Sequence, residues 1–362
     1  MSERRSVRVS IGVWSLVVAL AALVALTFIP TQYVIQRPGP VYDTLGTAPS
    51  ADGAQVPLIE VEGTRTYETG GALNLTTVQL MGNRERTPSW LELATAWLDP
   101  SRAVVPIDVA FPQGLTAEER DERNAALMVN SQHEATAAAL IELGYDVGAT
   151  VEVVEVIEDS PSVGVLEVGD VILAVDGRPL ESAADLRAEI QKGKGEAVEL
   201  TLQDGDGERT VTITPEETTD DAGETVWLIG VAPTTEYDFP VDVTIQLDNV
   251  GGSSAGMMFT LGIIDTLTPG QLNGGKDVAG TGTIDASGAV GPIGGIRQKL
   301  YGARDAGADY FLAPETNCDE VVGHVPDGLE VFSTGTLDES LEILEVIAEG
   351  GDTSELPTCT AP

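Results

Sequence analysis

The sequence has few of the residues that bind metals or act as imidazole bases. Its 362 residues include only two histidines and two cysteines, scattered without the spacing of a metal site. Basic residues are also scarce: 19 lysines and arginines stand against 58 aspartates and glutamates, a formal net charge of −39. A chain this acidic repels phosphate backbones. We therefore expect neither a metal site nor a nucleic-acid partner, while a hydrophobic content of 42% indicates a folded protein.

Charge is absent from residues 11–29, IGVWSLVVALAALVALTFI. A helix of this length reaches about 28 Å, close to the hydrocarbon thickness of a bilayer. Arg4, Arg5 and Arg8 precede the run, so the positive-inside rule places residues 1–10 in the cytoplasm and everything from about Pro30 outside. The following residues show no clear A-x-A cleavage site. We expect residues 11–30 to be a retained anchor in the cell membrane rather than a cleaved signal peptide.

Both cysteines, Cys318 and Cys359, fall on the side that we expect to be exported. Cysteines in such a compartment are able to pair, and a disulfide here would tie the C-terminal tail to the preceding domain, contributing about 3–4 kcal/mol. Two unpaired thiols are the alternative, and the sequence leaves both open.

Three folded blocks follow the apolar run and predict an α+β protein. Residues 31–145 contain the alternating segments PLIEVEG and ALNLTTVQLMG, typical of strands, and a helix at 116–144 with a threonine cap and a closing glycine. Residues 146–215 form a self-contained unit of strands with one helix. Residues 216–349 alternate strands and helices as an α/β block, and residues 350–362 are a tail.

The middle block contains SPSVGVLEVGDVILAVDGRPLESAADLRAEI, residues 160–190. This stretch resembles PDZ domains of the type associated with bacterial proteases. The resemblance implies that the block binds the C-terminus of a substrate or adaptor as an added β-strand, in a groove between a strand edge and a helix. It also implies a loop that receives the terminal carboxylate, which we place at Val147, Gly148, Ala149 and Thr150.

The third block contains GSSAG, residues 252–256, between an expected strand and an expected helix. This G-x-S-x-G pattern in that position is typical of a hydrolase nucleophile elbow, which would expose the hydroxyl of Ser254. The turn residues Gly252, Ser253 and Ala255 would then place backbone N–H groups where an oxyanion develops. A glycine-rich helix start with a serine cap is the alternative.

A nucleophilic serine needs a base, and the only histidines are His133 and His324. A Ser-acid-His order would be formally met by Ser254 and His324. The candidate acids between them are Asp277, Asp285, Asp305 and Asp309. However, His324 lies in a polar stretch of turn character, and His133 lies on the helix before the PDZ-like block. Both are more simply surface residues.

Lysine is the other base known for such serines. Lys299 lies on an expected helix beside Ile296 and Leu300, after Gly294 and Gly295. Burial would lower its pKa by several units and make the neutral amine available near pH 7. A solvated helix lysine is the alternative on composition alone.

Three segments together favour the lysine: GGSSAGMMFTL, GTGTIDASGAVGPIGGIRQK and ARDAGADYFLAPETN. They resemble the proteolytic domain of Lon-type serine peptidases over about a hundred residues. That family carries G-P-S-A-G around its serine and T-G-x-I-x-x-x-G-x-V-x-P-I-G-G-[LI]-x-x-K around its lysine. The resemblance implies that Ser254 is the nucleophile, Lys299 the base and Thr281 a residue that hydrogen-bonds the lysine. Ser253 stands where the family usually has proline, which leaves two adjacent serines, and the Ala-Gly that follows selects Ser254.

A second glycine-rich segment, GQLNGGKD at residues 270–277, has the outline of a phosphate-binding loop but ends in aspartate instead of serine or threonine. No other ATP-binding signature is present, and an exported domain would meet no ATP. We therefore expect an ATP-independent enzyme without a cofactor.

An anchor, a PDZ-like block and a Lon-like block, in that order, resemble a bacterial family of membrane-anchored, PDZ-containing Lon-like proteases. The resemblance implies a serine endopeptidase outside the cytoplasm, acting on protein or peptide substrates. The segments YVIQRPGPVYDTLG and GGALNLTTVQL also resemble N-terminal segments of that family. If GGALNLTTVQL belongs to the protease fold, the PDZ block is an insertion within that fold; a separate N-terminal region is the alternative. Lon-like domains tend to form rings, so a homo-oligomer is a further expectation. The alternatives are a membrane-tethered PDZ scaffold whose Lon-like domain no longer cleaves, and a Ser-His-Asp hydrolase.

Overall fold

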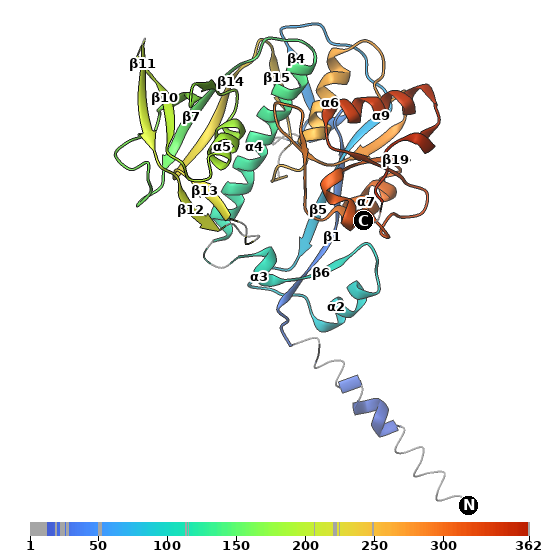
Figure 1. Cartoon of the computed structure of the whole chain (residues 1–362). Helices are drawn as coiled ribbons and strands as arrows, with labels where there is room; N and C mark the ends of the chain where they lie inside the picture. Colours follow the sequence, from blue (N-terminus) through green and yellow to red (C-terminus); the bar gives the residue numbers. More distant parts are fainter. Residues whose placement is uncertain are drawn as a thin grey trace, which may run out of the picture. The chain divides into compact units, whose positions relative to one another are not determined.

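The computed structural model describes residues 13–18, 20, 21, 26, 29–49, 53–112, 114, 116–205, 207–219, 223, 225–247 and 250–360. The chain divides into two compact units (Figure 1). Unit 1 comprises Met1–Ala139 and Val241–Pro362, and unit 2 is Leu140–Pro240. Across the described ranges, no helix is long and apolar enough to cross a membrane. Of the expected anchor at 11–30, residues 11, 12, 19, 22–25, 27 and 28 lie outside these ranges.

Unit 1 is built around a six-stranded sheet in the order β20-β19-β16-β5-β1-β6. The strand β16 pairs in parallel with β5 and β19, while β1 runs antiparallel to β5 and β6. The strands are β1 (Tyr33–Asp43), β5 (Ala72–Met81), β6 (Ala103–Pro106), β16 (Asp277–Gly280), β19 (Tyr310–Pro314) and β20 (Glu330–Thr334). Strands from before and after residues 140–240 thus share one sheet, which makes unit 2 an insertion in the fold of unit 1.

Short strand pairs complete unit 1. They are β2 (Thr47–Pro49) with β3 (Gln55–Pro57), β4 (Ile59–Glu62) with β15 (Asp242–Ile245), and β17 (Thr283–Ile284) with β18 (Val290–Gly291). The helices are α2 (Trp90–Trp97), α3 (Ile107–Ala110), α4 (Ala117–Glu142), α6 (Gly256–Leu267), α7 (Ile296–Ala306), α8 (Cys318–Val321) and α9 (Leu337–Glu349), with 3₁₀ turns at Glu315–Asn317 and Thr353–Glu355.

Helix α6 is the most deeply buried element of unit 1. All of its residues except Thr266 are buried, and most of them are apolar. Gly262 allows this close packing, because a Cβ at that position would lie only 2.7 Å from Thr44 Oγ1 and 2.8 Å from Ile59 Cδ1. This close packing against Thr44 and Ile59 fixes the position of α6 and of the turn that precedes it.

The predicted helix at 116–144 is confirmed as α4, and its start has a capping box. The Thr116 N–H donates to Glu119 Oε2 at 2.7 Å, and the Glu119 N–H donates to Thr116 Oγ1 at 3.2 Å. Gly144, with a φ of 80°, follows the helix end.

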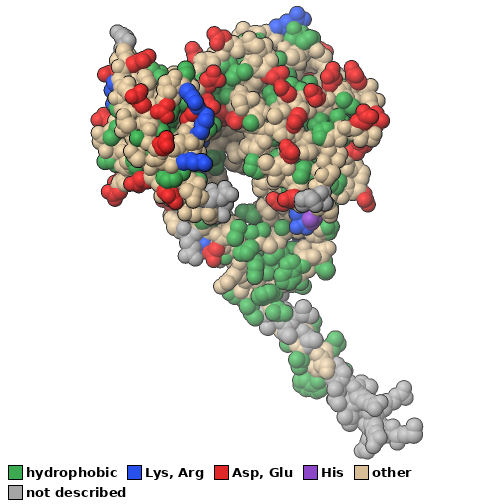
Figure 2. Space-filling model, in the orientation of Figure 1, with side chains coloured by type: hydrophobic (Ala, Val, Ile, Leu, Met, Phe, Trp, Pro, Cys, Tyr) green, Lys and Arg blue, Asp and Glu red, His purple; other side chains and the backbone are tan. Residues whose placement is uncertain are grey.

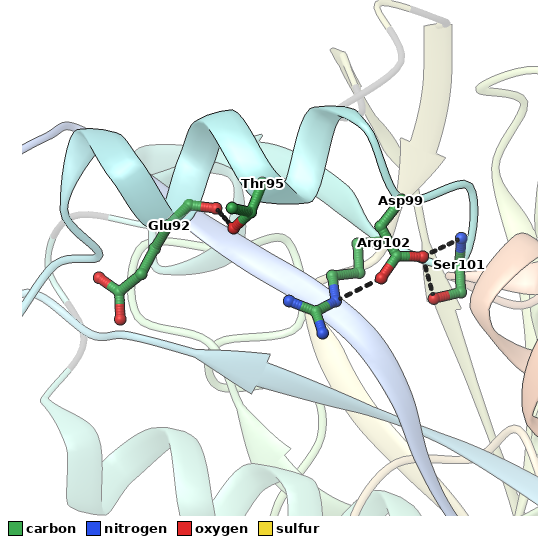
Figure 3. A network of polar contacts seen from close by, with 5 residues as sticks. All are labelled: Glu92, Thr95, Asp99, Ser101 and Arg102. Atoms are coloured by element: carbon green, nitrogen blue, oxygen red, sulfur yellow. Dashed lines mark hydrogen bonds and ion pairs between the residues drawn. The ribbon is translucent and has the colours of Figure 1, made fainter.

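Helix α2 has a capped start and a hydrogen-bonded turn just after its end. At its start, the Ser89 N–H donates to Glu92 Oε2 at 2.6 Å in a second capping box. Beyond its end, Asp99 accepts hydrogen bonds from the N–H and the hydroxyl of Ser101 and pairs with Arg102 Nε at 2.9 Å (Figure 3). Within the helix, Thr95 Oγ1 donates to the carbonyl of Glu92, three residues earlier.

The two cysteines form a disulfide. The Cα atoms of Cys318 and Cys359 are 4.9 Å apart, and the sulfurs are bonded. Cys359 also packs against a core cluster that includes Ile296, Leu300 and Phe311. The C-terminal tail is thereby fixed to the part of unit 1 that contains α7 and β19.

Unit 2 is a sheet in the order β11-β10-β8-β7-β14, with β9 paired to β8 and a separate β12-β13 hairpin. Its elements are β7 (Gly148–Val156), β8 (Val171–Val175), β9 (Arg178–Pro179), α5 (Ala183–Lys192), β10 (Val198–Asp204), β11 (Gly207–Ile213), β12 (Glu216–Thr219), β13 (Thr225–Leu228) and β14 (Val231–Asp238). The unit extends to Pro240 rather than to residue 215, because β14 pairs with β7 along its length. A sequence boundary drawn after β11 misses this non-local strand.

The expected carboxylate-binding loop has a different structure. Gly148, Ala149 and Thr150, which follow Val147, belong to strand β7. Their partners in β14 are Asp238, Tyr237 and Glu236. Backbone that is paired within the sheet is not an open loop, so this assignment of residues 147–150 needs correction. The terminal strands of the sheet are β11 and β14.

Candidate active site

Ser254 lies in the turn just before α6. Gly252 has a φ of 92°, a left-handed conformation that favours glycine, and Ala255 is the N-cap residue of α6. The Ser254 carbonyl accepts hydrogen bonds from the Gly282 N–H at 3.0 Å and from Thr281 Oγ1 at 2.9 Å. These two bonds fix the turn to the segment between β16 and β17.

Two contacts from α4 hold the other side of the turn. The Gly252 N–H donates to the Asn124 carbonyl at 3.0 Å, and Ser131 Oγ donates to the Ser253 carbonyl at 3.1 Å. Gly252 is one of the expected oxyanion donors, but its N–H is already engaged by the Asn124 carbonyl. Of the expected donors, the N–H groups of Ser253 and Ala255 remain candidates for that role, and the N–H of Ser254, which lies between them before α6, joins them.

Lys299 is brought to Ser254 by α7. Its Nζ lies 2.7 Å from Ser254 Oγ and 2.8 Å from Thr281 Oγ1, although the two chemical groups of the pair are 45 residues apart in the sequence. The preceding Gly295 has a φ of 71°, and a Cβ there would lie 2.7 Å from Val78 Cγ1. Glycine at this position therefore allows the start of α7 to approach β5.

The protonation of Lys299 is set by burial. Its side chain is 1% exposed, and desolvation lowers its pKa to about 7. Among the ion pairs of the described residues, none involves this lysine. A substantial fraction of the amine is therefore neutral at pH 7 and able to accept a proton.

Thr281 orients the lysine through both sides of its hydroxyl. Its only proton is donated to the Ser254 carbonyl, so its oxygen accepts a hydrogen bond from Lys299 Nζ. A neutral amine with one N–H committed to Thr281 keeps its lone pair for the proton of Ser254 Oγ. This geometry suits proton abstraction from a serine hydroxyl.

A cavity of about 280 Å³ opens beside this pair. Ser254, Ala255, Gly294 and Lys299 line it together with residues from distant segments. Those distant residues are Pro40 and Tyr42 of β1, Thr76, Thr77, Val78 and Gln79 of β5, Met128 of α4, and Val250 and Gly251. The register of β1 against β5 shifts between Pro38 and Val41, next to this cavity.

The histidines have other positions. His133 lies on α4, and His324 follows α8, where its Nδ1 is buried without a hydrogen-bond partner. Neither lines the cavity, nor do the four candidate acids. One of these acids, Asp285, accepts hydrogen bonds from Ser287 and the Ala289 N–H within a turn. The fold therefore places a lysine, and neither histidine, beside Ser254 Oγ.

The glycine-rich segment at 270–277 is closed to phosphate. The N–H groups of Gly274, Gly275 and Lys276 donate to Gln271 and Asn273 within the same loop. A Cβ on Gly274 would lie 2.4 Å from Ala348 Cα, so the loop packs against α9. The N–H groups that cradle phosphate in a nucleotide-binding loop are thus already used.

Asn317 is a positioning residue that no sequence motif marks. The buried Asn317 exchanges two hydrogen bonds of 2.9 Å with Ile293, using both ends of its amide. Ile293 comes just before the glycines that start α7, so Asn317 fixes the approach of that helix. The cavity-lining residues of β1, β5 and α4 were also missed, since they carry no motif and come together only in the fold.

Comparison with known proteins agrees with this geometry. Residues 247–347 match the family model described as the Lon protease (S16) C-terminal proteolytic domain, and residues 121–214 match that of the PDZ domain. The chain is 35% identical over 140 residues to Lon protease 2 of Herpetosiphon aurantiacus. It is 34% identical over 119 residues to Lon protease of Azospirillum brasilense, and 37% identical over 93 residues to Lon protease 1 of Sorangium cellulosum. These matches support a serine endopeptidase.

The likeness to these relatives is local. The three matches cover 34%, 31% and 25% of this chain, but only 17%, 14% and 11% of the relatives' own lengths. Among solved structures, the PDZ domains of SdrC-like proteins from Listeria monocytogenes and Listeria innocua are 27% and 28% identical to this chain. Each match covers 23% of this chain, and they cover 85% and 92% of the respective PDZ structures. The TM-score is 0.21 in both cases.

Proposed function

We propose that this protein is a membrane-anchored, ATP-independent serine endopeptidase that uses a Ser254–Lys299 dyad. The observation that carries the proposal is the 2.7 Å contact between Lys299 Nζ and Ser254 Oγ, made by a buried lysine whose pKa is lowered to about 7. A solvated lysine would be protonated at neutral pH and unable to act as a base.

The chemistry follows from the positions of three side chains. Neutral Lys299 takes the proton of Ser254, and the hydroxyl oxygen attacks a peptide carbonyl in the cavity. N–H groups at the start of α6 stabilise the oxyanion, and protonated Lys299 then gives its proton to the departing amine. Water hydrolyses the acyl-enzyme, with Lys299 again as the base. Thr281 acts as a positioning residue, holding the amine toward Ser254 throughout.

The proposed peptide site of unit 2 is the outer edge of β14 beside α5. As the last strand of its sheet, β14 offers a row of backbone groups to an added strand. Helix α5 packs next to it, with the Ala183 N–H donating to Thr235 Oγ1 at 2.9 Å. A substrate or adaptor C-terminus bound here would be delivered to the protease unit without ATP.

Localisation follows from the sequence. We assign residues 11–30 as a single membrane anchor with residues 1–10 in the cytoplasm. The folded parts of both units then lie on the opposite side of the membrane, outside the cytoplasm. Suitable substrates are then flexible tails, misfolded chains or peptides near the membrane, because the proposal includes no unfolding motor.

A fluorophosphonate probe that labels nucleophilic serines tests the dyad. We expect labelling of the wild type and loss of labelling in both Ser254→Ala and Lys299→Ala, while His324→Ala is labelled like the wild type. Labelling that survives in Lys299→Ala and disappears in His324→Ala would replace the dyad with a triad. If the wild type is neither labelled nor able to cleave any unfolded protein, the inactive scaffold is the better reading.

A further inference from the structure

One end of unit 1 exposes large apolar side chains that are not packed in its core. We call it the apolar end surface: Leu91 and Trp97 of α2, Leu98 just after it, and Val109 of α3. Their exposed fractions are 48%, 61%, 87% and 70%. Figure 2 shows hydrophobic side chains gathered at this end. The rest of the visible surface of unit 1 has many acidic side chains.

The two faces of α2 explain why these residues are exposed. Leu93 and Ala96 face inward and pack with Ile35 of β1. Leu91 and Leu98, seven residues apart, lie on the opposite side, since a helix repeats every 3.6 residues. Between them this outer side carries Ala94 and Thr95 and no charge. The only acid of α2, Glu92, is held by the capping box at the N-terminus.

The polar groups near this surface are largely satisfied within the protein. The capping box occupies the start of α2, and Asp99 is paired with Arg102 and Ser101 after its end (Figure 3). Such a helix enters a layer of low water content at a smaller desolvation penalty than one with open polar ends.

The chain tethers this surface to the apolar N-terminal run. That run ends at Ile29, and Thr31, two residues later, donates its hydroxyl to the Pro88 carbonyl at 2.7 Å and its N–H to Thr87 Oγ1 at 3.1 Å. Pro88 directly precedes the N-cap residue of α2. Two residues span at most about 7 Å. The start of α2 therefore lies within a few ångströms of the end of residues 11–29, whatever surrounds them.

A second tether holds α3 in the same way. The carbonyl of Gln32 accepts a hydrogen bond from the Ile107 N–H at 2.9 Å, and Tyr33 at the start of β1 pairs with Pro106 of β6. Both helices of the apolar end surface are thus fixed next to the point where the chain leaves the apolar run (Figure 1).

We propose that the apolar end surface inserts into the outer interface of the bilayer that residues 11–29 span, with Trp97 at the headgroup level. The proposal rests on the membrane anchor of the proposed function. Tryptophan favours this interface because its ring is apolar and its N–H is polar. With a net charge of −39 and no basic residue in α2, the contact is apolar rather than electrostatic and does not require anionic lipids. It would fix the height of unit 1 above the membrane.

The two native cysteines are bonded to each other, so a single introduced cysteine accepts a nitroxide label selectively. We would label Leu98→Cys in the full chain, reconstituted in phosphatidylcholine nanodiscs, and measure collisions with oxygen and with a water-soluble nickel complex. Val18→Cys, in the apolar run, is the lipid reference, and Val325→Cys, an exposed apolar position of unit 1, is the aqueous control.

We expect the label at position 98 to collide several-fold more with oxygen than with nickel, as at position 18, while the label at 325 shows the reverse. If the label at position 18 collides mainly with oxygen but the label at position 98 collides mainly with nickel, the inference is overturned and the anchor stands. If 98 is shielded from both reagents or shows spin–spin broadening, a protein contact or a second copy covers the surface, which also overturns it. If the label at position 18 collides mainly with nickel, both the anchor and this inference are contradicted. The dyad is not affected by that result, because the serine probe tests it separately.

A label-free measurement checks the same contact. In a Trp14→Phe chain, lipids brominated near the headgroup should quench a part of the tryptophan fluorescence that disappears when Trp97→Phe is added. Quenching that is equal in both chains would contradict the insertion of Trp97.

Discussion

The two units of this chain offer a ligand two different kinds of surface. Unit 1 brings together side chains from distant parts of the sequence, with a buried lysine 2.7 Å from a serine hydroxyl beside a cavity. Unit 2 offers the backbone of a terminal strand, β14, next to helix α5. The first surface depends on the position and protonation of single atoms. The second depends on a continuous strand edge, which most side-chain changes leave in place.

This difference predicts how each unit responds to mutation. Chemistry at the dyad should be lost with one side chain even when the fold is intact, because no neighbour replaces a nucleophile or its base. Binding at β14 should weaken gradually, since a β-addition spreads its free energy over several hydrogen bonds.

Removal of either dyad residue should give the largest effect. We expect Ser254→Ala and Lys299→Arg each to lower kcat/KM for an unfolded protein substrate by on the order of 10³-fold or more. Arginine keeps the charge but cannot lose its proton, so it removes the base alone. The matched control is Ser253→Ala, which should stay within a few-fold of the wild type. Equal losses at both serines would show that the turn, not the hydroxyl of Ser254, is what matters.

The pH dependence of activity follows from the lowered pKa of Lys299. Below about pH 7 the amine is protonated, so kcat/KM should rise with pH and reach half of its plateau near pH 7. A rate profile from pH 5 to 9 measures this directly. A half-maximum near pH 10 would mean that the lysine titrates as if exposed to solvent.

The same shift affects stability. Between about pH 7 and 10.5 the unfolded chain keeps the Lys299 proton that the folded chain has lost, so this residue makes stability rise with pH in that window. Below pH 7 both states are protonated, and the folded state carries the full cost of the buried charge. We expect Lys299→Met to increase the free energy of unfolding at pH 6 by on the order of a few kcal/mol. Urea unfolding of both chains at pH 6 and 10 measures the difference, which should shrink at pH 10.

Loss of the disulfide should destabilise unit 1 by a comparable amount. The bond closes a loop with a sequence separation of 41 residues. Chain-entropy arguments give about 3–4 kcal/mol for a loop of this size. Thermal unfolding of the wild type should therefore shift downward in reducing buffer, while the Cys318→Ser/Cys359→Ser chain already melts lower and does not respond. A wild type indifferent to reductant would show that the tail contributes little.

The sequence predicted the parts of the site that are encoded by local patterns. Gly252 and Gly295 mark turns that need a left-handed backbone, and Thr116 with Glu119 marks the start of α4. The pairing of Ser254 with Lys299 required the resemblance to a family, because a lysine on a helix gives no local sign that it is buried. Once the fold is known, its position on α7 explains the burial.

Non-local pairing limited the rest. β14 follows the β12-β13 hairpin, yet it completes the sheet of unit 2 by pairing with β7. Periodicity identifies each strand but not its partner, so β14 was not expected in the sheet of unit 2 and residues 148–150 were expected in a loop. The walls of the cavity were missed for the same reason, since Tyr42, Val78 and Met128 come from three separate elements.

The smallest predicted effect concerns the support of α5 in unit 2. Gln191 clamps this helix to β13: its Nε2 donates to the Trp227 carbonyl at 2.6 Å, and its Oε1 accepts from the Trp227 N–H at 2.9 Å. Gln191→Ala leaves both backbone groups without that partner, so we expect a loss of about 1–2 kcal/mol in the free energy of unfolding. Gln203→Ala, at an exposed position of β10, should change it by much less. Because the clamp lies wholly in unit 2, serine-probe labelling of Ser254 should be unchanged in both variants. Binding of a C-terminal peptide should weaken only in Gln191→Ala, and a parallel loss of labelling would show that the two units do not act as separately as their contrast implies.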